Sequence, residues 1–217
     1  MKKILLILAL AVLCTSNANA QFWVGAKAGF GAYWIPKTTI ELGEQVVPHN
    51  AFYGGIVGGF EAGNGMILQT ELLYSGKGFS SRTNNPDIAT NDKYLHNIDY
   101  LQIPVMVGWQ LLDDEALKLM LGPELGILLG DRVLHKDYSS GSEVVITDER
   151  NTGLCRPLNL ALAFQATYLI FDNLGIDLKF DIALTRTFKQ GIPLPDYMND
   201  KGHNLGAQLG VVYMLDI

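Results

Sequence analysis

Charged side chains alternate with apolar ones in the segment Gly175–Thr185, whose sequence is GIDLKFDIALT. Asp177, Lys179 and Asp181 occupy every second position, so they share one face if the segment is a β-strand. An acid–base–acid row on a buried face can form a salt-bridge network, because buried charges are costly unless they are paired. The same row can also line a path for protons or cations. The spacing therefore allows two kinds of chemistry, a static ionic core and a conducting lumen, and we favour the static core.

Catalytic chemistry has little support in the sequence. The four histidines are scattered and form no compact metal-ligand pattern. A lipase, acyltransferase or protease site needs a nucleophile and a base close together in space, and no motif selects one here. The candidates for these two roles are Ser80, Ser81, His96, His135 and Ser139. The sequence therefore predicts no enzymatic activity, no metal and no cofactor.

The first twenty residues have the pattern of an export signal. A short basic stretch, Met1–Lys3, precedes an apolar run over residues 4–13. Ala18-Asn19-Ala20 is a small-x-small cleavage site. We predict cleavage after Ala20, which divides the chain into a signal peptide, residues 1–20, and one mature domain, residues 21–217.

The mature chain is acidic and contains one cysteine. The 217-residue chain has 16 basic and 22 acidic side chains, and loss of Lys2 and Lys3 leaves a net charge of about −8. That charge argues against nucleic acid as a partner. Cys155 alone cannot form an internal disulfide. Cys14 leaves a lipoprotein as an alternative, but Leu13 is larger than the residue expected before a lipidated cysteine.

Eight strand-like segments separated by short and long connections in strict alternation make up the mature chain. No apolar run after the N-terminus reaches the 18 residues of a transmembrane helix. Short turns on one side and long loops on the other are typical of a transmembrane β-barrel, which also has an even number of strands. The predicted strands are Phe22–Trp34, Ala51–Ala62, Gly65–Ser80, Tyr94–Leu112, Ala116–Asp131, Gly153–Phe171, Leu174–Phe188 and His203–Ile217.

Each predicted strand has an apolar face and a face that mixes glycine and alanine with isolated polar residues. A narrow eight-stranded interior suits that mixture, because small residues leave room for a few long polar ones. A charge facing mid-bilayer lipid costs about 2–4 kcal/mol, so the polar face is assigned to the lumen. The predicted lumen network comprises Lys27, Glu61, Gln69, Glu71, Gln102, Lys118, Glu124, Gln165, Asp177, Lys179, Asp181 and Gln208.

Aromatic residues near the ends of the predicted strands indicate girdles, the bands of aromatic side chains that outer-membrane barrels place at the two membrane interfaces. The residues assigned to these girdles are Trp23, Trp34, Tyr53, Phe60, Tyr74, Tyr94, Trp109, Phe171, Phe188 and Tyr213.

Two motifs resemble a known family. The stretch YLQIPVMVGWQ, from Tyr100, and the stretch LKLMLGPELGILLGDR, from Leu117, are similar to the Tyr-Leu-x-Ile-Pro and Gly-Pro-x-x-Gly strands of the PorT-like outer-membrane β-barrel domain of Gram-negative bacteria. The resemblance implies an eight-stranded barrel in the outer membrane. Most members have no assigned activity, and one member type assists a protein-secretion system. Because proline cannot donate to a β-ladder, we expect a bulge or irregularity at Pro104 and at Pro123.

We therefore expect an all-β protein, an eight-stranded antiparallel up-and-down transmembrane β-barrel in the cell outer membrane. It is predicted to be a monomer without enzymatic activity, with a lumen plugged by side chains and long extracellular loops in structural or recognition roles. Its expected partners are outer-membrane lipid and other envelope or secretion proteins. The alternatives are a secretion accessory, a narrow porin-like pore for small solutes, an outer-membrane enzyme acting on lipid, and a soluble periplasmic ligand-binding barrel whose Leu158, Leu160 and Leu162 face inward.

Overall fold

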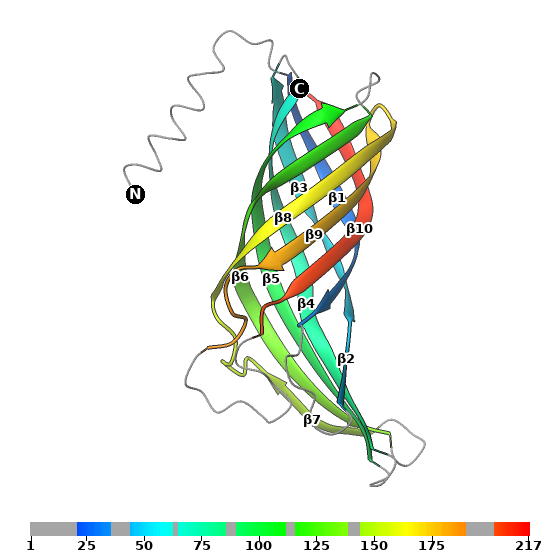
Figure 1. Cartoon of the computed structure of the whole chain (residues 1–217), viewed down its shortest axis with the longest axis vertical. Coiled ribbons are helices and arrows are strands. Elements are labelled where there is room, and N and C mark those ends of the chain that lie inside the picture. The colour runs from blue at the N-terminus through cyan, green and yellow to red at the C-terminus, as the bar shows by residue number, and fades with distance from the viewer. Residues whose placement is uncertain are drawn as a thin grey trace, which may run out of the picture.

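The computed structural model is an elongated, closed antiparallel β-barrel (Figure 1). It describes residues 21–35, 44–62, 65–85, 90–111, 116–138, 144–189 and 202–217. Among these residues, no helix is long and apolar enough to cross a membrane. The predicted signal peptide, with its cleavage site and Cys14, lies outside the described residues and stays a prediction.

Eight of the strands form the closed ring, which confirms the predicted fold class. Each pairs with its two neighbours in the order β1–β3–β4–β5–β6–β8–β9–β10, and the β1–β10 pairing closes the barrel. The strands of the ring are β1 (Gln21–Trp34), β3 (His49–Ala62), β4 (Met66–Asn85), β5 (Thr90–Leu111), β6 (Leu117–Asp137), β8 (Leu158–Phe171), β9 (Leu174–Ala183) and β10 (Leu205–Asp216).

The alternation in β9 separates two environments. Ile176 and Phe180 are exposed on the outer wall, whereas Asp177, Lys179 and Asp181 are buried inside the barrel. The outer wall of β8 follows the same rule, since Leu158 and Leu160 are 55% and 48% exposed. Leucines that face outward contradict the soluble ligand-binding barrel, which required them to face the interior.

The two ends of the barrel differ. Both Gln21 and Ile217 lie at one end, together with the short connections β3–β4, β5–β6 and β8–β9, and we call it the turn end (Figure 1). The opposite end, the loop end, carries the other connections and two short additional strands, β2 (Glu44–Val47) and β7 (Val144–Arg150). β2 pairs with β4, and β7 pairs with β6.

Strands at the loop end run further than the sequence predicts. β4 and β5 stay paired out to Asn85 and Thr90, beyond the predicted limits Ser80 and Tyr94, and β6 continues to Asp137. Residues expected to form loops therefore build a sheet that projects from the barrel (Figure 1). We call it the β-arm, and it consists of β2, residues 80–85 of β4, residues 90–95 of β5, residues 133–137 of β6, and β7.

Two predicted strands are too long at the same end. β8 begins at Leu158 rather than Gly153, and β9 ends at Ala183 rather than Phe188. The residues left over, 153–157 and 184–188, form two segments that lie side by side at the loop end. There Cys155 and Phe188 pair in an isolated β-bridge.

The prolines interrupt pairing without shifting it. Around Pro104 the β4–β5 ladder lacks the pairs between Thr70–Val105 and Leu73–Gln102, yet the register is the same on both sides. The Thr70 hydroxyl donates to the Pro104 carbonyl oxygen at 3.0 Å. Pro123 keeps its place opposite Leu162 of β8. The β5–β6 ladder also lacks the pairs between Pro104–Glu124 and Val107–Leu121, so the expected irregularity occurs at both prolines, but without a bulge. The register shift of that ladder lies instead at Asp99/Tyr100.

Candidate functional site

The polar residues predicted for the lumen lie in the barrel interior, with one exception. Eleven of the twelve are buried, and Glu61 is half-buried next to the turn end, opposite Gln21. The eleven are Lys27, Gln69, Glu71, Gln102, Lys118, Glu124, Gln165, Asp177, Lys179, Asp181 and Gln208. Their positions follow from β alternation, which directs every second side chain of each strand inward.

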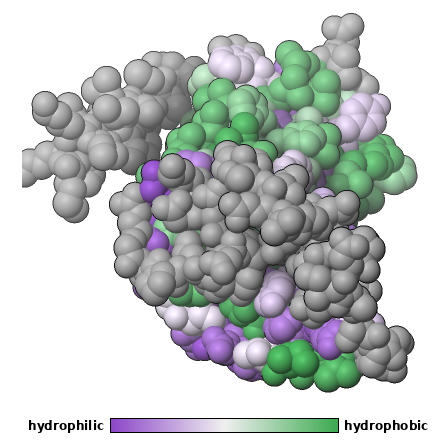
Figure 2. All heavy atoms as spheres, turned by 60° about the horizontal axis from the view of Figure 1, so that its bottom comes forward, coloured by the Kyte–Doolittle hydropathy of each residue, from purple (hydrophilic) through white to green (hydrophobic). Residues whose placement is uncertain are grey.

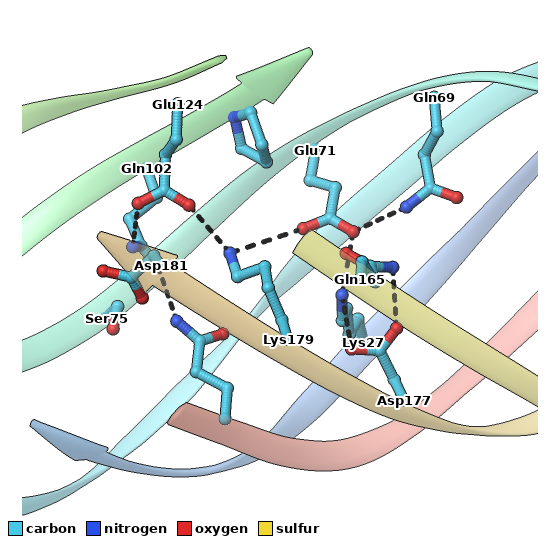
Figure 3. A network of polar contacts seen from close by, with 12 residues as sticks. Lys27, Gln69, Glu71, Ser75, Gln102, Glu124, Gln165, Asp177, Lys179 and Asp181 are labelled. Carbon is cyan, nitrogen blue, oxygen red and sulfur yellow. Dashed lines mark hydrogen bonds and ion pairs between the residues drawn. The ribbon is translucent and has the colours of Figure 1, made fainter. Parts of the chain in front are cut away.

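The first half of the network centres on Lys27 of β1. Its Nζ lies 2.8 Å from Glu71 Oε1 and 2.8 Å from Asp177 Oδ2, so it bridges carboxylates from β4 and β9 (Figure 3). Gln69 donates to Glu71 Oε1 at 2.7 Å, and Gln165 donates to Asp177 Oδ1 at 2.7 Å. These bonds occupy lone pairs that Lys27 leaves free, which offsets the cost of burying the carboxylates.

The second half centres on Glu124 of β6. Lys179 Nζ lies 2.9 Å from Glu124 Oε2, and Lys77 Nζ lies 3.1 Å from Glu124 Oε1. Lys77 also reaches Asp181 Oδ2 at 2.9 Å. Gln102 donates to Glu124 as well, and Figure 3 shows this contact beside the Lys179 pair. Lys179 is 3.8 Å from Glu71 Oε2, which joins the two halves into one network.

Sequence reasoning missed one essential cation. Lys77 is 3% exposed and neutralises two carboxylates, but it was not among the predicted network residues. The signal was present, because Lys77 lies an even number of residues from Gln69 and Glu71 in β4 and therefore shares their face of the strand. We call this odd or even position in a strand its parity. Lys118 was included but lies elsewhere, with its Nζ 5.3 Å from the Trp23 ring centroid. The ionic network therefore holds three lysines and four carboxylates.

Apolar side chains fill the interior on both sides of the network. Toward the turn end, Trp23, Val57, Val212 and Met214 form one cluster, and Ile67, Met106, Met120 and Ala163 form another. At the loop end a third cluster contains Ile35, Phe79, Ile98, Tyr100, Cys155 and Phe188. The network is thus enclosed between apolar layers.

These layers correct part of the predicted girdle. Trp23, Tyr53 and Phe188 are buried inside, although they had been assigned to the membrane surface. Trp109, Phe171 and Tyr213 are exposed, as a girdle requires. Position along a strand could not distinguish these two groups, whereas parity does, because Trp23 lies on the same face of β1 as Lys27.

The histidines take part in packing at the loop end. His96 is buried and stacks on Phe79, with ring centroids 4.9 Å apart. His135 stacks on Tyr94 at 4.2 Å. In the part of the chain that the structure describes, no group of three or more histidine, cysteine or acidic side chains could hold a metal ion. Ser139 and the side chain of Ser81 lie outside that part.

Comparison with known families decides what kind of barrel this is. A family model described as "Outer membrane protein beta-barrel domain" matches residues 16–189. The chain belongs to this family. It is therefore an outer-membrane β-barrel protein.

Solved structures of other outer-membrane barrels are similar over nearly their whole length. Neisserial surface protein A is 14% identical, with 90% of this chain and 98% of that chain covered and a TM-score of 0.42. Ail of Yersinia pestis is 10% identical, with 89% and 98% covered and a TM-score of 0.44. The protease OmpT of Escherichia coli is 9% identical, with 93% and 97% covered and a TM-score of 0.36. At these identities the likeness does not extend to function. No curated protein sequence matches the chain.

Proposed function

We propose that this outer-membrane barrel is non-conducting and non-enzymatic, and that it presents the β-arm as a recognition surface outside the cell. The observation that carries the proposal is the ionic network enclosed between apolar layers. An eight-stranded barrel is just wide enough for side chains to fill. A permeating ion would have to displace buried Lys–carboxylate pairs, whose separation leaves uncompensated charges in a low-dielectric interior.

The β-arm supplies the recognition surface. Val144, Val145 and Ile146 of β7 are 46%, 51% and 54% exposed. β7 pairs with β6 alone among the described strands, so it presents a free edge, and exposed sheet edges are sites of strand addition by other chains. In Figure 2 the coloured side chains in the lower part of the view include both hydrophilic and hydrophobic ones, while hydrophobic ones prevail in the upper part.

Planar-bilayer recording of the purified full chain tests the closed lumen. We expect no stable single-channel conductance, with a large-pore porin in the same membrane as the positive control. A large and stable conductance would contradict the proposal and favour the narrow-pore alternative. Unchanged lipid profiles in a strain lacking the protein would agree with the absence of lipid-modifying activity, and an altered profile would contradict it.

A secretion accessory is the second candidate, because of where the PorT-like motifs lie. They occupy β5 and β6, two ring strands that continue into the β-arm and pair with each other there. Any partner held by the arm would therefore be mechanically linked to the motif strands. Co-purification of secretion proteins with the intact chain, lost when residues 144–150 are replaced by a Gly/Ser linker, would favour this role.

A further inference from the structure

Three basic side chains gather where β8 begins and β9 ends. Arg156 precedes β8 by two residues, and Arg186 and Lys189 follow β9. The Arg156 backbone N–H donates to the Thr187 carbonyl at 2.9 Å, and the Lys189 N–H donates to the Leu154 carbonyl at 3.0 Å. We call Arg156, Arg186 and Lys189 the basic rim. These bonds join the two segments, so the backbones of Arg156 and Lys189 lie side by side, and Arg186 precedes Thr187 in the same segment.

The bridge between the segments turns two of these cations away from the lumen. Cys155 and Phe188 lie opposite each other and are both 1% exposed. Arg156 and Lys189 flank this inward-facing pair and are both partly exposed, so we place them on the outer face. Their charged ends are anchored to backbone oxygens, Arg156 Nε to Phe188 O at 3.1 Å and Lys189 Nζ to Gly153 O at 2.7 Å.

The basic rim forms no ion pair with the described residues, and the nearby Asp131 is bound by Thr152. Residues 153–158 and 184–189 contain no acidic residue. None of the ion pairs among the described residues includes Arg156, Arg186 or Lys189. Like charges held close together on a sheet are destabilising. A local excess of three positive charges on an acidic protein is therefore a site suited to an anion.

The rim stands at the edge of the hydrocarbon-facing wall. Leu158, Leu160 and Leu184 are 55%, 48% and 62% exposed, and the Leu184 N–H donates to the Leu160 carbonyl at 2.7 Å. Arg156 lies two residues beyond Leu158, and Arg186 two residues beyond Leu184. The backbones that carry the cations thus follow directly on the outward-facing Leu158 and Leu184, on the side that the proposed function places outside the cell.

We propose that the basic rim binds the phosphate of an outer-leaflet lipid headgroup, while the leucines below it contact the acyl chains. Guanidinium groups bind phosphate through paired hydrogen bonds, and lysine adds a point charge. A lipid can contact both the basic rim and the exposed leucines, whereas a free phosphate ion contacts the basic rim alone. The basic rim therefore fixes how deep the barrel sits in the membrane and which side of the barrel faces the bound lipid.

Native mass spectrometry of the full chain in a neutral detergent tests this site, with bisphosphorylated lipid A as the probe. The double variant Arg156→Gln/Lys189→Gln should bind it roughly 25-fold more weakly, since each surface cation contributes about fivefold. Fully dephosphorylated lipid A should bind the unaltered chain with a similar loss. The matched control is Lys93→Gln/Arg150→Gln, which removes two cations from the β-arm and should leave the affinity unchanged.

Three results would overturn the proposal. The first is an unchanged affinity in the rim variant, and the second is an equal loss in the β-arm control. The third is complete displacement of lipid A by millimolar inorganic phosphate, which would indicate a site for the free anion. Arg186→Gln keeps the test decisive if the double variant does not fold, because its side chain makes none of the backbone contacts above, and a loss of about fivefold is then expected.

Discussion

Single residues of the lumen are stabilised by partners that lie far away in the sequence. Lys179 on β9 reaches Glu124 on β6, and Lys27 on β1 reaches both Glu71 on β4 and Asp177 on β9. Buried pairs of this kind add little net stability compared with apolar residues of the same size, but removing one partner is expensive. The network is therefore sensitive to single substitutions.

Lys179→Met should destabilise the barrel by about 3–5 kcal/mol, because it leaves Glu124 and Glu71 with less compensation inside the lumen. Methionine keeps most of the side-chain length, so the loss reports the charge. The measurement is the free energy of unfolding in urea from lipid vesicles. Lys93→Met on the β-arm is the control, and an equal stability of the two variants would refute the assigned role of Lys179.

Parity explains what could be predicted about individual residues. It placed eleven of the twelve predicted polar residues in the interior, because β-strands alternate strictly. Glu61, which was placed by the same rule, is half-buried next to the turn end. The other errors have different causes. Lys77 was omitted from the network, and Trp23 and Tyr53 were assigned to girdles from their positions near strand ends. Pairing distances, such as Lys77 to Asp181, depend on barrel closure and cannot be obtained from one strand.

At the level of elements, the β-arm is the feature that the sequence did not reveal. Residues 80–85 and 90–95 are mostly polar on both faces, and such a pattern is typical of a loop. They form strands because they continue an existing ladder, in which each further pair needs no new nucleation. β2 and β7 likewise depend on β4 and β6 as templates.

A substitution at Gly78 tests how closely β4 approaches β5 where β4 enters the β-arm. Its φ is 148°, and a Cβ there would collide with the backbone carbonyl of His96 on β5. Gly78→Ala should therefore lower the stability by about 1–3 kcal/mol. Gly58→Ala is the matched control, since the nearest atom to its Cβ would be 3.6 Å away. Unfolding in urea compares the two, and equal losses would contradict the close β4–β5 approach.

The apolar cluster at the loop end shields Cys155. Burial raises the pKa of its thiol to about 12, and the side chain is 1% exposed, so the native thiol should not react with a water-soluble maleimide near neutral pH. Phe188 packs edge-on against Phe79, with centroids 6.0 Å apart.

Phe188→Ala should make Cys155 reactive by removing this cover, and mass spectrometry of the labelled chain measures the change. The conductance should stay at zero, because the ionic network below is intact. Labelling of the unaltered chain at the same rate would show that the cluster is open.

For the whole molecule, the closed ring was predictable because several independent signals agreed. Loop length, strand number, face chemistry and the export signal all indicated a transmembrane barrel. The apolar layers above and below the network were not predictable. They combine residues that are distant in the sequence. One cluster joins Trp23 of β1 to Val212 and Met214 of β10, and another includes Cys155 and Phe188, which lie outside the ring strands.

The complete barrel should migrate on a gel as a compact species until it is boiled. Its unfolding free energy should change little between about 0.05 and 0.5 M salt, since buried ion pairs are screened far less than exposed ones. Lipid A binding at the basic rim should weaken over the same range. A strong salt dependence of unfolding would mean that water reaches the network, which would contradict the closed lumen.

The charges inside the barrel also have a consequence for how the chain assembles. β9 alone brings two acids and one base, β1 brings a lone lysine, and β6 brings a lone glutamate to the network. Each ion pair of the network joins two strands that belong to different hairpins, such as Lys77 of β4 with Glu124 of β6, so no hairpin can form these pairs by itself. A hairpin entering the bilayer by itself would carry unpaired charges, so we expect insertion and closure to occur as one concerted step. Because closure joins the two ends of the chain, that step should be slow for a protein of this size.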